Sequence, residues 1–306
     1  MKKTKIIFLV LPKVHLLDLA GADQVFYEAI DYGLPVDVVY CSYTDALETS
    51  TLLGLGALEH FSEVDVNEGD YVMIPGAETS LINGPEMAAQ KDLFQWVIDA
   101  WHKKANLCSI CTGAYFLAMT GLLDGRKCTT HWKHTDILRR KFPRVNVLDN
   151  ILFTEEDRLF TSAGVTSGID LALHIVAKLK DDHLSYKIAR ELVVYNRRSG
   201  QDAQQSVHLK YRNHIHSGIH KVQDRLQESI DEKLLLDDLA DIACMSTRNM
   251  TRVFKKETGI TINDYINLLR KEKIRELLKN PDLSRRDIAR HCGLKSERQI
   301  SRIMKA

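Results

Sequence analysis

The sequence predicts two parts of different fold class. The first is an α/β domain, a parallel sheet sandwiched by helices, and the second is all-α with two helix-turn-helix motifs. Three observations predict this division. The chain has 306 residues, which is long for one domain. Strand-like and helix-like runs alternate up to about residue 180, as in parallel sheets covered by helices. From residue 241 onward the runs are helical and basic, with 16 Lys and Arg against 8 Asp and Glu.

The α/β part is built from short apolar, β-branched runs and longer runs with helical spacing. Together they predict a flavodoxin-like sheet with ligands beyond the carboxyl ends of its strands. The expected strands are 5–11, 36–40, 71–74 and 107–110, and the expected helices are 19–30, 93–103 and 184–195.

Composition and cysteine usage indicate the cellular environment of the protein. Pro12 and Lys13 end the first apolar run after six residues, which favours a buried strand over a signal peptide. No apolar run is long enough to cross a membrane. The six cysteines are scattered, which indicates reduced thiols and a cytoplasmic protein. We expect neither a cofactor nor a resident metal ion.

Cys111 stands between the predicted strand 107–110 and a helix, with Gly113 two residues on. This layout is typical of a nucleophile elbow, in which the thiol is exposed and the helix N-terminus favours its thiolate. Asp18, Gly76 and Ala77 also follow predicted strands, so three segments converge on one site.

The chemistry of this site has several interpretations. A thiolate beside the N–H groups of Gly76, Ala77 and Thr112 would attack an electrophilic carbon, with these donors stabilising developing negative charge. Asp18 would share or donate a proton. The alternatives are that the pocket only binds a small ligand, or that Cys111 is merely oxidisable.

Histidines give a second set of hypotheses. His131 either assists at the site or is a structural histidine. His131 and His134 are three residues apart, as in some metal sites, but no third ligand is apparent. The cluster at 208, 214, 216 and 220 is expected to lie solvated around a connecting helix over about 206–229.

Several strings of the first part resemble the PfpI-like branch of the glutamine-amidotransferase-like superfamily. They are Leu-Leu-Asp-Leu-Ala-Gly at 16–21, Ile-Pro-Gly-Ala at 74–77, Ile-Cys-Thr-Gly-Ala at 110–114, Thr-Thr-His-Trp at 129–132 and Thr-Ser-Ala-Gly-Val-Thr-Ser-Gly-Ile-Asp-Leu-Ala-Leu at 161–173.

This resemblance implies that Asp18 lies against Cys111. Thr112 after the cysteine is similar to the isonitrile-hydratase subgroup, whereas protease-like members have histidine there, so peptidase activity is not expected. Two departures are Ala22, where the subgroup usually has proline, and Ala77, where glycine is common.

The C-terminal part contains two helix–turn–helix patterns, about 49 residues apart. In the first, Ser246 caps a helix that buries Met250 and Phe254, and in the second Gly293 marks the turn. A helix over 263–278 joins them, about 24 Å long at 1.5 Å per residue. The two recognition helices would then sit roughly one DNA turn, about 34 Å, apart. The alternative is an ordinary helical bundle.

This part is similar to the AraC/XylS DNA-binding domain. The matching signatures are Leu-Ala at 239–240, Met-Ser-x-Arg at 245–248, Arg-x-Phe at 252–254, Gly259 with Tyr265, Ile-Ala at 288–289, and Gly293. Departures are Ile262 for proline, Leu294 and Ile300 for phenylalanine, and Met304 near the end; we expect the fold to survive with a looser second core. Residues expected to contact DNA are Arg248, Asn249, Arg252, Lys295, Ser296, Arg298, Gln299 and Arg302.

The expected organisation is an α/β sensor domain at 1–196, a linker and connecting helix at 197–220, and a DNA-binding domain at 221–306. The two resemblances together identify a GlxA-like AraC/XylS-family regulator. It would bind double-stranded DNA as a homodimer under the control of a small-molecule effector. The alternatives are a thiol-dependent enzyme, hydrating an isonitrile or hydrolysing a small amide at Cys111, and a DNA-bound module whose first domain only dimerises.

Overall fold

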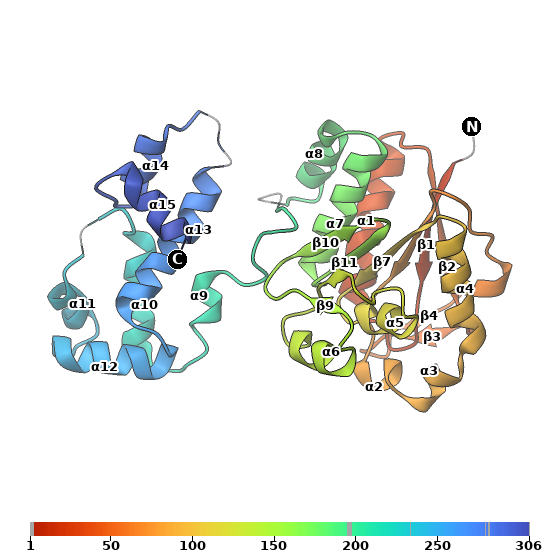
Figure 1. Ribbon diagram of the computed structural model, residues 1–306, viewed down its shortest axis with the longest axis horizontal. Coiled ribbons are helices and arrows are strands. Elements are labelled where there is room, and N and C mark those ends of the chain that lie inside the picture. Colours follow the sequence, from red (N-terminus) through yellow and green to blue (C-terminus); the bar gives the residue numbers. More distant parts are fainter. Residues whose placement is uncertain (1–2, 195–197, 233, 279, 281, 306) are drawn as a thin grey trace. The chain divides into compact units, whose positions relative to one another are not determined.

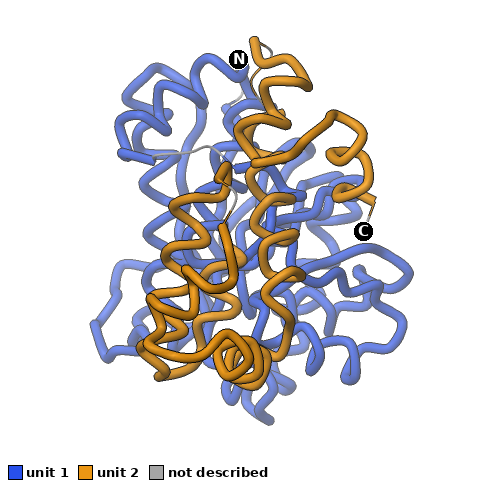
Figure 2. Tube along the Cα trace, turned by 90° about the vertical axis from the view of Figure 1, so that its left-hand side faces the viewer, with its two compact units in different colours: residues 1–204 blue, residues 205–306 orange. Residues whose placement is uncertain are grey.

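The computed structural model describes residues 3–194, 198–232, 234–278, 280 and 282–305. The chain divides into two compact units, residues 1–204 and 205–306, which Figure 2 colours separately. The predicted boundary after residue 196 falls on residues outside the described ranges. No helix formed by the described residues combines the length and the apolar character that a membrane crossing requires.

Unit 1 is a seven-stranded sheet between two layers of helices (Figure 1). The strands of this sheet are β1 (Thr4–Leu9), β2 (Val36–Ser42), β5 (Glu59–His60), β6 (Tyr71–Ile74), β7 (Asn106–Ile110), β10 (Phe153–Glu156) and β11 (Leu159–Ser162). Their order is β10-β11-β7-β6-β1-β2-β5, and all neighbours are parallel except β10 and β11. The predicted α/β fold is confirmed. Four of the seven strands were expected; β5, β11 and the antiparallel edge strand β10 were not.

Side chains alternate across this sheet, as the period of two along a strand requires. In β1, Ile6 and Phe8 belong to one core, and Ile7 and Leu9 belong to the other. The first core is completed by α1 (Leu16–Asp31), α7 (Thr166–Leu179) and α8 (Asp182–Glu191), and the second by α4 (Lys91–His102) and α5 (Gly113–Met119). A strand buried on both faces appears in the sequence as a continuous apolar run. For this reason β1 could be predicted from the sequence.

The remaining elements of unit 1 are short. They are the strand pairs β3 (Leu47–Glu48) with β4 (Gly54–Leu55) and β8 (Lys127–Cys128) with β9 (Asn146–Val147), the 3-10 helix η1 (Phe61–Glu63), and the helices α2 (Thr79–Ile82), α3 (Pro85–Ala89) and α6 (Thr135–Lys141). The predicted helix 184–195 is α8; its last predicted residue lies outside the described part of the chain.

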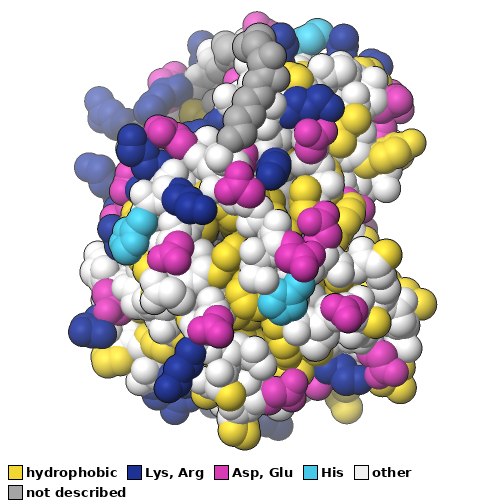
Figure 3. All heavy atoms as spheres, turned by 90° about the vertical axis from the view of Figure 1, so that its right-hand side faces the viewer, with side chains coloured by type: hydrophobic (Ala, Val, Ile, Leu, Met, Phe, Trp, Pro, Cys, Tyr) yellow, Lys and Arg dark blue, Asp and Glu magenta, His cyan; other side chains and the backbone are white. Residues whose placement is uncertain are grey.

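On the face of the molecule drawn in Figure 3, charges of both signs are interspersed.

Unit 2 is all-helical. Its elements are α9 (Val207–Lys210), α10 (Ser217–Glu228), α11 (Leu236–Ile242), α12 (Thr247–Thr258), α13 (Ile262–Leu277), α14 (Arg285–His291) and α15 (Glu297–Lys305). The predicted single helix over about 206–229 is wrong, because the chain leaves the helix after Lys210 and resumes it at Ser217. Tyr211 in this break packs edge-on against Tyr265 of α13, and His216 caps α10 by accepting the N–H of Ile219.

Two small cores hold the two helix-turn-helix motifs, and α13 contributes to both. Tyr265 and Leu269 lie in the core of α10, α11 and α12, while Ile274 lies in the core of α14 and α15. Ile262 takes the first position of α13 behind the capping box of Thr261 and Asp264. That position suits proline because its N–H needs no partner there. Buried Ile262 therefore replaces the family's proline without loss of the helix start.

Candidate functional site

The site in unit 1 forms where four strands end. Asp18 lies in the first turn of α1 after β1, Gly76 follows β6, Cys111 follows β7, and Gly164 follows β11. The sequence predicts three of these segments. The fourth, with Gly164, lies in the family-like segment 161–173, for which the sequence alone predicts no place at the site. Parallel strands bring their carboxyl ends to one edge of a sheet, which explains the convergence.

Cys111 adopts a backbone conformation that side chains rarely take, with φ +55°. Gly113 makes this turn possible, because a Cβ there would lie 2.1 Å from the carbonyl oxygen of Ile74. The amide of Cys111 donates to the carbonyl of Ser162 at 2.9 Å. The predicted elbow between strand and helix is therefore present, and neighbouring backbone fixes it on two sides.

The thiol of Cys111 is not exposed as the elbow pattern predicted; the residue is 5% exposed. Gly76 and Gly164 close over it, since a Cβ on either would lie 2.9 Å and 2.2 Å, respectively, from the Cβ of Cys111. Burial first, and then the negative charge of Asp18, raise the pKa of the Cys111 thiol well above its ordinary value, against an opposing backbone hydrogen bond from Thr112. The expectation of a favoured thiolate is contradicted, because burial and a carboxylate outweigh the helix terminus.

Asp18 is 1% exposed, and its two oxygens differ in environment. Oδ1 accepts the amide of Val165 at 2.6 Å. Oδ2 has no hydrogen bond of good geometry, but lies 3.4 Å from Nδ1 of His15. A carboxylate oxygen of Asp18 lies within 4.8 Å of the Cys111 sulfur, so Asp18 lies against Cys111, as the resemblance implies.

Thr112 joins the elbow to the loop after β6. Its Oγ1 accepts the amide of Ala77 at 3.0 Å and donates to the carbonyl of Ala77 at 2.7 Å. The Ala77 amide is thus already engaged. It is therefore not free to stabilise a developing negative charge, which is the role that the sequence predicts for it. Thr112 acts here as a fastening between two of the converging loops.

The histidines around the site divide into near and peripheral. His15, which sequence reasoning missed, stands three residues before Asp18 and faces it; the i, i+3 spacing at the start of α1 was the available signal. His131 is half-buried, and burial together with the charge of His134 lowers its pKa. Its ring packs 6.0 Å from that of His134.

Ligand atoms of His15, Asp18 and Cys111 all lie within 4.8 Å of one another, and this is the one such group of His, Cys, Asp or Glu side chains among the described residues. Zn²⁺ bonds of about 2.0 to 2.3 Å place tetrahedral ligand atoms roughly 3.5 Å apart. The three side chains would have to draw together to hold such an ion.

The histidines at 208, 214, 216 and 220 are half-buried and make specific contacts, whereas the sequence predicts that they are solvated. The ring of His220 lies 4.5 Å from that of His214 and its Nε2 bonds to the carbonyl of His214 at 2.7 Å. His208 Nε2 bonds to Arg212 at 2.9 Å. They hold the break between α9 and α10.

In unit 2, the residues predicted to contact DNA lie on α12 and α15 and in the turn before α15. Ser246 caps α12 by accepting the amide of Asn249. Arg248 and Arg252 are exposed and line a groove shared with Lys255 and Lys256. Asn249 is half-buried and accepts a hydrogen bond from Arg252 at 2.8 Å.

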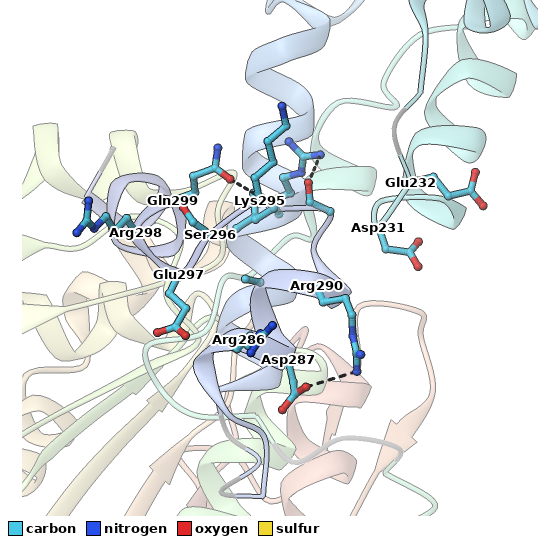
Figure 4. Close-up of a pocket in the computed structure, with 14 residues that line it drawn as sticks. Asp231, Glu232, Arg286, Asp287, Arg290, Lys295, Ser296, Glu297, Arg298 and Gln299 are labelled. Atoms are coloured by element: carbon cyan, nitrogen blue, oxygen red, sulfur yellow. Dashed lines mark hydrogen bonds and ion pairs between the residues drawn. The ribbon is translucent and has the colours of Figure 1, made fainter.

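The second set lines another groove, of about 1260 Å³ (Figure 4). It includes Lys295, Ser296, Arg298 and Gln299, while Arg302 lies exposed further along α15. The side-chain oxygen of Gln299 accepts the amide of Lys295 at 2.7 Å and so fixes the turn into α15. Both predicted sets lie in helix-turn-helix motifs. Their basic side chains and Ser296 are exposed, whereas Asn249 and Gln299 are half-buried.

These features define a class of protein: an α/β unit with a buried cysteine elbow, followed by two helix-turn-helix motifs. Residues 4–178 match the DJ-1/PfpI family, and residues 239–306 match a helix-turn-helix domain. The chain belongs to the DJ-1/PfpI family and carries the C-terminal domain of AraC-family regulators, as its motifs predicted. A helix-turn-helix domain implies DNA binding.

Three relatives show the extent of the similarity. The HTH-type transcriptional regulator GbdR of Pseudomonas aeruginosa (strain UCBPP-PA14) is 32% identical over 200 residues, which are 64% of this chain and 53% of that protein. The isonitrile hydratase of Pseudomonas putida is 30% identical over 172 residues, 56% of this chain and 70% of the hydratase. The crystal structure of an AraC family transcriptional regulator from Pseudomonas putida is similar in fold, with a TM-score of 0.53 at 20% identity over 62% of this chain and 99% of that one. This chain therefore spans about half the length of GbdR.

Proposed function

We propose that this protein regulates transcription by binding a specific sequence of double-stranded DNA. The observation that carries the proposal is the pair of helix-turn-helix motifs, each with its own core and with exposed arginines on α12 and α15. One 16-residue helix, α13, fixes their separation. Arginine in a major groove reads guanine and contacts phosphate, so these side chains suit both affinity and sequence selection.

Unit 1 supplies the control in this proposal. The elbow of Cys111, with Asp18 and His15 beside it, is the site of a small-molecule effector, and a homodimer of the chain presents the motifs to DNA in the cytoplasm. The similarity to GbdR, a transcriptional regulator, supports this arrangement. The buried, protonated thiol favours a role in binding over nucleophilic attack, which needs a thiolate.

Selection of bound duplexes from a random DNA library by the full chain tests the DNA-binding proposal. We expect an enriched motif with two contacted segments about one helical turn apart. Arg252→Ala and Arg298→Ala should each weaken binding of that motif by about 1 to 3 kcal/mol. Arg190→Ala, an exposed arginine of α8, is the control and should bind as the parent does. Failure to enrich any motif would refute the proposal.

Effector binding and assembly have separate tests. A small molecule that binds unit 1 should raise the unfolding temperature of the full chain, by mass action on the native state. Light scattering should give the mass of a dimer. A monomer that still selects the DNA motif would remove the homodimer from the proposal and leave the rest intact.

The alternative function is a thiol-dependent reaction on an isonitrile or a small amide at Cys111. The similarity to isonitrile hydratase and the contact between Asp18 and Cys111 favour it. Turnover of such a compound by the full chain, abolished in Cys111→Ala, would establish it. A full transcriptional response in that same variant would show that regulation needs no chemistry at the thiol.

A further inference from the structure

Residues 198–204 form a strap that runs back over unit 1 before the chain enters unit 2 at residue 205. The strap makes hydrogen bonds to unit 1 at its beginning, middle and end. The first and last attachments bind residues that lie next to, or are themselves, hydrogen-bond donors to the two central residues of the site, Asp18 and Cys111.

The first attachment is Arg198. Its guanidinium donates to Oδ2 of Asp170 at 3.0 and 2.5 Å, and to Oγ1 of Thr166 at 2.8 Å. Asp170 is 3% exposed, and Arg198 is its ion-pair partner. Thr166 opens α7, and the residue before it, Val165, donates the amide that holds Asp18. Arg198 therefore fixes the start of α7, next to the Val165 amide that binds the carboxylate of Asp18.

The middle attachment is Gly200. Its carbonyl accepts the amides of Leu152 at 2.9 Å and Phe153 at 3.2 Å. A Cβ on Gly200 would lie 2.6 Å from the carbonyl oxygen of Phe153, so no other residue fits without a shift. This contact fixes the path of the strap between its two ends.

The last attachment is Gln204, the final residue of unit 1. Its Nε2 donates to the carbonyls of Thr130 and Ile151, both at 3.0 Å. The hydroxyl of Thr130, buried at 0% exposure, donates to the carbonyl of Cys111 at 2.7 Å. Gln204 therefore positions Thr130, whose hydroxyl binds the backbone carbonyl of Cys111 at the elbow.

We propose that the strap couples the Cys111 site to the helix-turn-helix unit, with Arg198 and Gln204 as its positioning residues. The proposal rests on the proposed function and names its regulation. A ligand that moves Asp18 relative to Cys111 strains Arg198, Gln204 or both. The hydrogen bond from Thr130 to Cys111 is buried, and those that Asp170 accepts from Arg198 and that Gln204 donates are partly buried, so each is costly to leave unmade. The strap continues within three residues into α9, so its displacement changes how the chain enters unit 2.

Coupling is reciprocal, so a change in the strap must also change the site. The first measurement is the rate at which N-ethylmaleimide modifies Cys111, followed by mass spectrometry of its peptide in the full chain. Cys244→Ala serves as the background, because Cys244 is an exposed thiol. We expect Gln204→Ala to change this rate about fivefold, the factor that one hydrogen bond of ordinary strength gives.

Gln201→Ala is the matched control, since Gln201 is a glutamine of the same strap with an exposed side chain. It should react as the background does. Arg198→Lys keeps the charge opposite Asp170 but loses the forked geometry. It tests the other end of the strap without leaving a buried carboxylate unpaired.

The second measurement is affinity for the selected DNA before and after modification of Cys111. In the background and in Gln201→Ala, modification should change the affinity at least threefold; in Gln204→Ala and Arg198→Lys this response should be reduced. If both variants keep the control's thiol reactivity and DNA response, the coupling is refuted while DNA binding stands. If no variant or parent selects DNA, the proposed function fails instead.

Discussion

At the scale of single residues, the site depends on two glycines that leave room for one cysteine. Gly164 has φ +85° and would place a Cβ 2.2 Å from that of Cys111. Gly69 has nearly the same conformation, φ +84°, with nothing within 4 Å of an added Cβ. Comparing Gly164 with Gly69 separates two effects of an added Cβ. The strain of a left-handed backbone is present at both residues, and the lack of space only at Gly164.

We expect Gly164→Ala to lower the free energy of unfolding by about 3 kcal/mol or more, from backbone strain and overpacking together. Gly69→Ala should cost only about 1 kcal/mol, because strain alone remains. Urea unfolding of the full chain measures both. Equal losses in the two variants would contradict the close packing of Gly164 on Cys111.

Asp18→Asn tests the electrostatic state of the thiol. Removing the charge takes away the second cause that raises the pKa of Cys111, while burial, the first, remains. The thiolate fraction at pH 8 to 9 should rise, and modification of Cys111 by iodoacetamide should accelerate roughly three- to tenfold.

Asp92→Asn, an exposed acid of α4, is the control for this substitution and should leave the rate as it is. An unchanged rate in Asp18→Asn would mean that the carboxyl group carries no charge beside the thiol.

The sequence specified the identity of the site residues better than their exposure. Asp18, Gly76, Cys111 and Thr112 converge because the motifs that carry them end parallel strands. The burial of Cys111 could not be predicted, because it results from Gly76 and Gly164 closing over the thiol from two other loops. Likewise, the bond between Thr112 and Ala77 depends on the spacing of β6 and β7, which no local pattern encodes.

At the scale of elements, a single capping residue sets the start of the first recognition helix. Ser246 accepts the amide of Asn249, next to Arg248. Ser246→Ala should therefore fray the turn that presents these side chains. We expect a loss of about 1 kcal/mol in unfolding free energy and weaker binding of the selected DNA.

Ser217→Ala is the matched control for the cap. Ser217 is the first residue of α10, but the cap of that helix is His216. The variant should bind DNA as the parent does. If Ser217→Ala and Ser246→Ala weaken DNA binding equally, the effect does not arise from the cap.

Helices and strands with strong periodicity were predicted nearly to their bounds; β6 and the cap of α12 agree to the residue. One prediction failed at 206–229, where apolar residues keep a helical spacing across the break, at 207, 211, 215, 219, 222 and 226. The chain turns there because Tyr211 packs on Tyr265 and His216 caps a new helix. These are contacts with a distant element and a capping choice, and neither changes the hydrophobic period of the segment.

At the scale of the whole molecule, buried thiols make stability depend on pH. Burial raises the pKa of Cys41 and of Cys128 to about 12, and raises those of Cys108 and Cys111. Below the ordinary thiol pKa of 9.0 these groups are protonated in both the native and unfolded states. Above it the unfolded chain releases protons that the native state keeps, so stability falls as pH rises.

We expect the unfolding free energy of the full chain, measured in urea, to fall steadily between about pH 9 and pH 11. Cys128→Ala should reduce that slope by up to about 1.4 kcal/mol per pH unit, the contribution of one thiol. Cys244→Ala should not reduce it, because that side chain is exposed in the native protein. A slope that Cys128→Ala leaves unchanged would contradict the buried, protonated state of Cys128.

The strap has a further consequence for the sheet itself. β10 is an edge strand, and unpaired edge amides are templates for aggregation. The carbonyl of Gly200 occupies the amide of Phe153, where β10 begins. A fragment ending at residue 196, the boundary expected from the sequence, would lose this cover together with Arg198 and Gln204. A fragment ending at 204 keeps all three, so it should stay monodisperse in light scattering under conditions in which the shorter one aggregates.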